Sequence, residues 1–134
     1  MRKDWSSINS LRIARPVTDL SKSTTMYCKG LGLDILASFK DHSGFDGVVL
    51  GLEGLPYHFE MTYCNYHQVP PSPTPEDLFV LYIPDPNEWQ YRCNSLLESG
   101  FIMVESFNPY WSKCGKTFQD CDGYRIVLQN SKWQ

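Results

Sequence analysis

Hydrophobic and polar positions follow the same order twice along the chain. Each time, a strand-like apolar run ends at an aspartate, Asp19 or Asp85, and apolar positions at helical spacing then continue to a glycine, Gly32 or Gly100. Alternation with a period of two is typical of strands, and recurrence every three or four residues is typical of amphipathic helices. We therefore predict two strand–helix units, whose aspartates lie 66 positions apart.

The first unit begins with a predicted strand at residues 11–17 and a predicted helix at residues 20–31. Asp19 supplies the N-cap carboxylate, and Gly32 supplies the left-handed C-terminal stop. Three short apolar runs separated by turn residues then predict strands at residues 35–39, 47–52 and 58–62. The order is strand, helix, three strands.

The second unit follows a connector, residues 69–75, with four prolines in seven residues, which excludes a helix or an interior strand. Asp85, Pro86 and Glu88 form a helix-start signature after an apolar run. An Asp-Gly pair within residues 121–124 predicts a hairpin turn. The predicted elements are a strand at 78–83, a helix up to Gly100 and strands at 101–105, 114–119 and 124–129.

The pattern predicts an α+β fold of two tandem βαβββ modules. We divide the chain into an N-terminal tail at residues 1–10, a first module at 11–66, a Pro-rich connector at 67–76 and a second module at 77–130. A chain of 134 residues with 42% hydrophobic content can bury one core without cross-links. We expect the two modules to form one domain.

Charge and cysteine usage narrow the partners and the compartment. The net charge is −3 and the basic residues are scattered, which argues against a nucleic-acid or membrane partner. No apolar run approaches about 18 residues, and no apolar segment follows the basic residues at the N-terminus. Five cysteines without a CxxC pair indicate free thiols in a reducing cytosol. We expect a cytoplasmic protein with a small-molecule partner.

The two modules, with Asp19, Tyr27 and Leu31-Gly32-Leu33 in the first and Asn108-Pro-Tyr-Trp111 and Asp122-Gly123-Tyr-Arg-Ile126 in the second, resemble the vicinal oxygen chelate superfamily. This superfamily includes glyoxalase I, extradiol dioxygenases, fosfomycin resistance enzymes and bleomycin-binding proteins. The resemblance covers residues 10–130. It implies that each module curls its sheet into a half-barrel, and that paired modules enclose a ligand cup, either within one chain or across a dimer.

The resemblance also implies where metal ligands would stand. The first-strand position, usually His, falls on Arg12 in the first module and on Leu78 in the second; the last-strand position, usually Glu, falls on Glu60 and on Val127. Guanidinium has no free lone pair and Leu has no donor atom, so one ligand in four remains. A one-residue error in register would bring in Asp77 instead.

Arg12, Glu60 and His58 have both a structural and a functional interpretation. Arg12 and Glu60 can form an ion pair that holds two strands together, because buried charges are normally paired. Alternatively, Arg12 receives an anionic or carbonyl group of a ligand, with Leu78 and Val127 as the apolar opposite wall. His58 lies two residues from Glu60 and faces the same way, so these two are the remaining metal candidates.

Aromatic residues favour a binding role. Most of them fill the half-barrel cores, but Tyr110 and Trp111 fall on a turn, where binding residues are frequent. Stacking surfaces of this kind suit an aromatic or amphipathic ligand. We treat Tyr110 and Trp111 as candidates for the lip of the cup.

We expect a glyoxalase- and bleomycin-resistance-like, metal-free protein that binds a small molecule for sequestration or resistance, as a homodimer without a cofactor. The alternative is a lyase, isomerase or thiol transferase of the same superfamily that uses a divalent metal at Glu60 and His58. A third possibility is a scaffold or regulatory protein with a filled cup. The identity of the ligand does not follow from the sequence.

Overall fold

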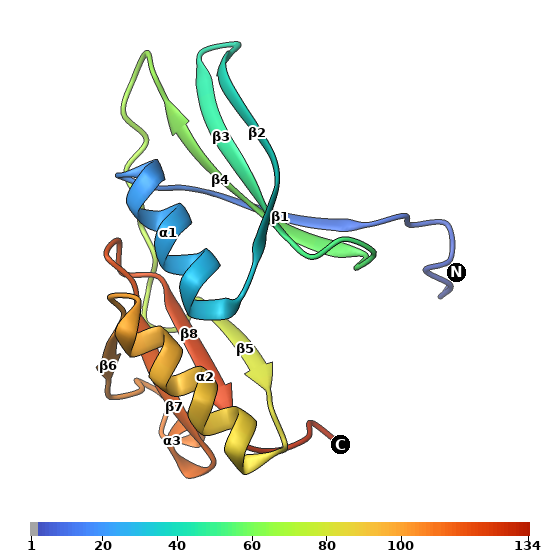
Figure 1. Cartoon of the computed structure of the whole chain (residues 1–134), viewed down its shortest axis with the longest axis vertical. Coiled ribbons are helices and arrows are strands. Elements are labelled where there is room, and N and C mark those ends of the chain that lie inside the picture. The colour runs from blue at the N-terminus through green and yellow to red at the C-terminus, as the bar shows by residue number, and fades with distance from the viewer. Residues whose placement is uncertain (1–2) are drawn as a thin grey trace.

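The computed structural model describes residues 3–134 and places their strands in two four-stranded sheets (Figure 1). Of the predicted tail at 1–10, residues 1 and 2 lie outside the described residues. The first module contains β1 (Leu11–Pro16), α1 (Leu20–Leu31), β2 (Asp34–His42), β3 (Phe45–Gly51) and β4 (Tyr57–Cys64). The second contains β5 (Leu78–Tyr82), α2 (Pro86–Glu98), β6 (Ile102–Val104), α3 (Tyr110–Lys113), β7 (Gly115–Gln119) and β8 (Arg125–Gln129).

Both sheets have the same topology. The strand orders are β1-β4-β3-β2 and β5-β8-β7-β6. In each sheet the first strand is parallel to the last strand of its module, and the remaining neighbours are antiparallel. The predicted α+β fold of two tandem βαβββ modules is confirmed.

The helix ends follow the predicted local chemistry. The Asp19 carboxylate accepts from the backbone N–H of Lys22 at 3.0 Å, and the Asp85 carboxylate accepts from Glu88 N–H at 2.8 Å. Gly32 has a φ of 70°, the left-handed conformation that a side chain disfavours, and it ends α1. Helix α2 stops at Glu98, slightly before the predicted end at Gly100.

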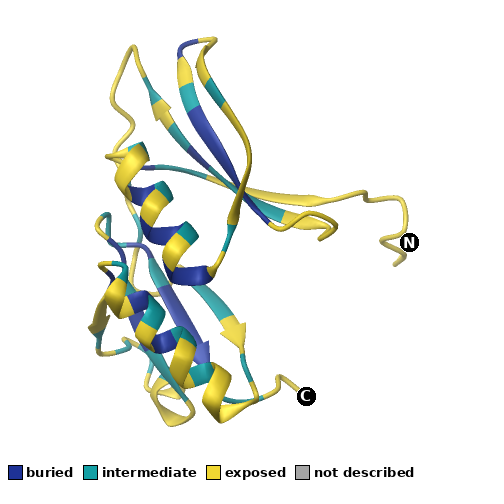
Figure 2. Cartoon of the chain, viewed as in Figure 1, coloured by how far each residue is buried: buried dark blue, intermediate teal, exposed yellow. Residues whose placement is uncertain are grey.

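The two helices pack against one face of each sheet and against each other, which produces one continuous core. Figure 2 shows buried segments where α1 and α2 meet the strands. The core takes alternate residues of the central strands, among them Leu50 and Met61 in the first sheet and Phe118 and Ile126 in the second. The intervening residues therefore point away from the helices, and we call this second side of each sheet its outer face.

Besides shifts of a few residues in element bounds, the secondary structure differs from the prediction at residues 110–113 and at His42. Residues 110–113, predicted as a turn, form the single helical turn α3. His42, predicted in a loop, is the last residue of β2. Within residues 3–134, no helix is both long and apolar enough to cross a membrane.

Candidate functional site

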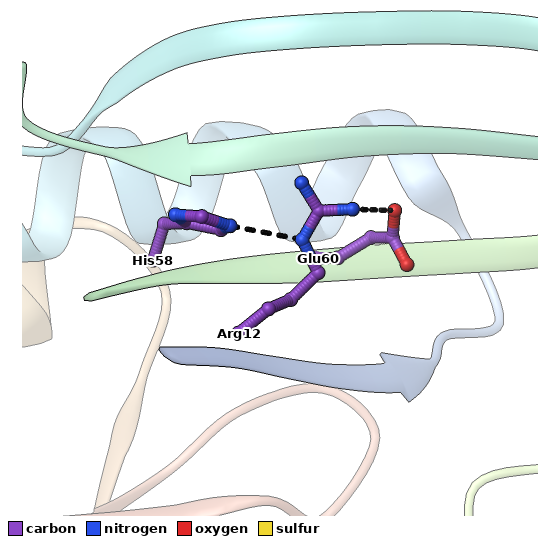
Figure 3. A network of polar contacts seen from close by, with 3 residues as sticks. All are labelled: Arg12, His58 and Glu60. Atoms are coloured by element: carbon purple, nitrogen blue, oxygen red, sulfur yellow. Dashed lines mark hydrogen bonds and ion pairs between the residues drawn. The ribbon is translucent and has the colours of Figure 1, made fainter. Parts of the chain in front are cut away.

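The outer face of the first sheet carries a charged cluster of three residues, Arg12, His58 and Glu60 (Figure 3). Strand β1 runs parallel to β4, with Arg12 opposite His58 and Ala14 opposite Glu60. Because side chains two positions apart share a face, His58 and Glu60 both reach the same guanidinium. Figure 3 shows the three side chains on the side of the sheet opposite α1.

Arg12 is the centre of this cluster. Its Nε donates to His58 Nε2 at 2.9 Å, and its Nη1 donates to Glu60 Oε2 at 3.0 Å. The predicted ion pair is therefore present, and it joins two neighbouring strands. The Arg12 side chain is 47% exposed and that of Glu60 is 16% exposed, so the guanidinium remains accessible. A guanidinium has five N–H donors, and two bonds leave others for a ligand.

Two strand glycines shape the surface beside this cluster. A Cβ at Gly47 would collide with the Phe39 ring, and a Cβ at Gly51 would lie 3.0 Å from Leu36 Cδ1. The glycines thus allow Phe39 and Leu36 to lie close to the backbone, next to the buried Val49. The sequence interpretation missed these residues, although glycine inside a strand is a known signal of close approach. The result is an apolar surface beside an accessible cation.

Leu78 and Val127 do not form the predicted opposite wall within the chain. Leu78 is half-buried and lines a groove between the modules. Val127 is 0% exposed. No ligand can contact Val127 in this conformation, because its side chain is fully covered inside the second module. The wall hypothesis is wrong for a single chain.

Tyr110 and Trp111 form an aromatic pair on α3. Their ring centroids lie 4.9 Å apart in an edge-to-face arrangement, and Tyr110 is 52% exposed. Helix α3 packs against β7, at the end of the molecule away from the first sheet (Figure 1). A single chain therefore does not bring this pair to Arg12.

The residues on the outer face of the first sheet do not fit the divalent metal that the superfamily resemblance implies. The available ligand atoms are those of His58 and Glu60, and Arg12 already donates to His58 Nε2 and to Glu60 Oε2. Catalytic zinc sites use about three protein ligands. Among residues 3–134, no group of three or more His, Cys, Asp or Glu side chains is arranged to hold a metal ion. The guanidinium instead supplies a fixed positive charge.

Comparison with solved structures defines the class of protein. Glyoxalase I of Leishmania major, described as trypanothione-dependent, aligns with a TM-score of 0.67 at 19% identity, over 90% of this chain and 84% of that one. The fosfomycin resistance protein FosX of Mesorhizobium loti aligns with a TM-score of 0.65 at 11% identity, over 99% and 95% of the two chains. The chain has the fold of the vicinal oxygen chelate superfamily.

Within that superfamily, the chain belongs to the YycE-like family. The family models of the YycE-like N-terminal and C-terminal domains match residues 11–62 and 76–130. The uncharacterized protein YycE of Bacillus subtilis (strain 168) is 41% identical over 134 residues, which cover 98% of this chain and 96% of that protein. A crystal structure of a YycE protein of unknown function from Bacillus subtilis, described as a candidate glyoxalase/fosfomycin resistance protein, aligns with a TM-score of 0.90 at 40% identity over 98% of both chains.

Proposed function

We propose that the chain is a metal-free small-molecule-binding protein, of the sequestration or resistance type, whose binding surface is the outer face of the first sheet. The bonding of Arg12 carries the proposal. Arg12 donates to both His58 and Glu60, the two side chains that remain as metal candidates. A permanent cation in that position favours recognition of a ligand over Lewis-acid chemistry.

The surroundings of Arg12 favour an amphipathic or aromatic ligand with an anionic or carbonyl group. The accessible guanidinium donors receive that group, and Glu60 fixes the orientation of the guanidinium. Phe39 and Leu36 provide the apolar surface for the rest of the ligand. Small-molecule sites commonly combine apolar walls with a few placed polar groups.

A second copy of the chain completes the site in this proposal. Strands β1, β2, β5 and β6 are the edges of their sheets, and they expose large apolar side chains. Among them are Leu11, Ile35, Leu81, Tyr82, Ile102 and Met103. Exposed apolar edge strands are unfavourable in an isolated monomer. A homodimer covers them and allows Tyr110 and Trp111 of one copy to close the site of the other. Sedimentation equilibrium tests this homodimer by measuring the mass of the protein in solution. A monomeric mass at micromolar concentration would contradict the dimer.

Calorimetric titration of the whole protein tests the binding function. Bleomycin and fosfomycin serve as ligand probes, and ZnCl2 and MnCl2 serve as separate metal probes. We expect a probe that binds the wild type to bind Arg12→Gln at least tenfold more weakly. Lys29→Gln, which removes an exposed charge from α1, is the matched control and retains affinity. A near-stoichiometric divalent ion that supports turnover of a glutathione hemithioacetal or an epoxide overturns the proposal.

The metal-dependent lyase, isomerase or thiol transferase remains the second candidate, because His58 and Glu60 share one face of β4. For this candidate, Glu60→Gln abolishes activity and leaves the melting temperature nearly unchanged. If Glu60→Gln instead lowers the stability strongly and the wild type has no activity, the result supports a structural ion pair between Arg12 and Glu60. We also propose a cytoplasmic location, supported by five free cysteines. Cell fractionation tests it.

A further inference from the structure

We propose that a groove between the two modules is a second ligand site, which binds a small organic monocarboxylate through Arg15. The groove has a volume of about 450 Å³ and lies between β1, the Pro-rich connector and β5. Ligand pockets commonly measure roughly 300–1,000 Å³. Arg15 faces away from Arg12, because the two residues are three positions apart on β1. The groove is therefore separate from the outer face of the first sheet.

Arg15 is held in place by residues of both modules. Its guanidinium carbon lies 4.1 Å from the ring centroids of Phe79 and of Tyr124. Its Nη2 donates to the Tyr27 hydroxyl at 3.0 Å, and that hydroxyl donates to the Asp120 carboxylate at 2.6 Å. Burial raises the pKa of Tyr27 far above its usual value, so the phenol stays protonated. The cation is thus preorganised before any ligand arrives.

This guanidinium has no direct counter-ion. Among residues 3–134, the one ion pair is that of Arg12 with Glu60. No carboxylate in this part of the chain forms an ion pair with Arg15. Arg15 is nevertheless half-buried, and charges in such positions are normally paired. The two aromatic rings limit the access of water to the cation. A carboxylate fits the remaining N–H donors, because guanidinium and carboxylate match as planar, two-pronged partners.

The walls of the groove favour an organic acid with a single charge. Ile13, Leu78, Pro70 and Pro73 are apolar and leave room for a hydrocarbon body, while the Ser72 hydroxyl adds one polar contact. Asp77 also lines the groove, and hydrogen bonds from the backbone and side chain of Thr74 lower its pKa. Its negative charge disfavours a multiply charged anion such as phosphate. The prolines stiffen the connector wall, which limits the entropy lost on binding.

Nuclear magnetic resonance of the 15N-labelled full chain tests this site. Sodium phenylacetate is the probe, and the controls are neutral 2-phenylacetamide and sodium phosphate at equal ionic strength. We expect saturable amide shifts for phenylacetate at Ser72, Leu78 and Tyr124; any shifts at His58 and Glu60 report separately on the outer face of the first sheet. We expect the amide and phosphate to bind at least tenfold more weakly.

Two variants on the same strand separate this site from the proposed function. Arg15→Gln should abolish the saturable shifts at Ser72, Leu78 and Tyr124, and Arg12→Gln should leave the shifts at these three residues in place. Equal shifts at Ser72, Leu78 and Tyr124 with the acid and the amide, or with phosphate, overturn the proposal, as do shifts confined to His58 and Glu60 or no shifts at all. If Arg15→Gln does not fold, the wild-type comparison of acid with amide and the map of shifted residues still decide. Loss of ligand binding on the outer face leaves this result unchanged.

Discussion

The outer faces of the two sheets share a backbone and differ in their chemistry. Glu60 lies on the last strand of the first module opposite Ala14, two residues after Arg12, and Val127 lies opposite Val80, two residues after Leu78. The first face presents an accessible ion pair, whereas Val127 is fully buried. Strand pairing and core packing maintain the shared frame. The outer-face side chains differ between the two modules within this shared backbone, so one face carries charge and the other is closed.

Exchanging the residue types of Glu60 and Val127 should give the largest effect on the free energy of unfolding. Val127→Glu places a carboxylate in a closed environment without a partner, so we expect the free energy of unfolding to fall by about 3 kcal/mol or more. The reciprocal Glu60→Val leaves Arg12 exposed and hydrogen-bonded to His58, so we expect a loss below about 1 kcal/mol. Urea unfolding of both variants measures the difference.

Val127→Ala is the control for this exchange, since it removes buried volume without adding charge. It should cost about 1–2 kcal/mol, less than the glutamate. Equal losses for Val127→Glu and Glu60→Val would contradict the assignment of one closed and one open face. So would a folded Val127→Glu protein that binds a divalent ion at neutral pH.

Equivalent glycines give the second comparison. Gly47 on β3 lies opposite Thr62, and Gly115 on β7 lies opposite Gln129, at matching positions of the two sheets. A Cβ at Gly47 meets only the half-buried Phe39 ring, which can rotate away, whereas a Cβ at Gly115 meets Gln129 and lies 2.7 Å from the Leu128 carbonyl oxygen. We expect Gly115→Ala to cost about 1–3 kcal/mol and Gly47→Ala less.

Thermal unfolding of Gly115→Ala and Gly47→Ala measures which variant loses more stability. Gly54→Ala serves as a control for backbone strain without close contacts, because Gly54 has a φ of 90° and open space around its Cβ direction. A larger loss for Gly47→Ala than for Gly115→Ala would show that the first sheet is packed more tightly than the second on its outer face.

Thr117 provides the third comparison. It lies opposite Val127 on the closed face, at the position that Val49 occupies opposite Glu60. The Thr117 hydroxyl oxygen is buried and has no hydrogen-bond partner among residues 3–134. Thr117→Val keeps the shape and removes the unpaired polar group, so we expect the free energy of unfolding to rise by about 1 kcal/mol. A loss of similar size in urea unfolding would instead reveal an ordered water or another partner at this hydroxyl.

The sequence predicted the two βαβββ modules and the charged residues of the candidate site. Asp19 and Asp85 marked helix starts because a capping carboxylate acts on amides three residues away. The Arg12–Glu60 ion pair was one of two interpretations of positions that the superfamily resemblance indicated. The helix caps depend on spacing within an element, and the ligand positions depend on the family pattern, so both could be located in the sequence.

The remaining features depend on contacts between distant parts of the chain. The burial of Val127 is set by packing inside the second module, which its strand neighbours in sequence do not reveal. Arg15 lies between Phe79 and Tyr124, both from the other module. The position of α3 relative to Arg12 likewise depends on the tertiary arrangement. No local pattern encodes these contacts.

The turns that precede β3 and β7 give the last and smallest comparison. Beside the β2–β3 turn, the carboxylate of Asp46 on β3 accepts from Asn65 Nδ2 at 2.9 Å and from Asp41 N–H on β2 at 2.8 Å, and these bonds lower the pKa of Asp46. In the segment before β7, Ser106 and Ser112 bond to each other without an ionisable group. The first turn should therefore respond to acid, and the second should not.

The sign of this response follows from linkage. The pKa of Asp46 is lower in the folded chain than its ordinary value of about 3.9, so its stabilisation is complete above that value and is lost as the pH falls through the lowered pKa. We expect the Asp41 amide proton resonance to move below about pH 4 in the wild type. Asp46→Asn should abolish that movement, because the amide oxygen still accepts but does not titrate. The Ser112 amide should be unaffected in both proteins, and a Ser112 shift that parallels that of Asp41 would indicate global acid unfolding rather than a property of the first turn.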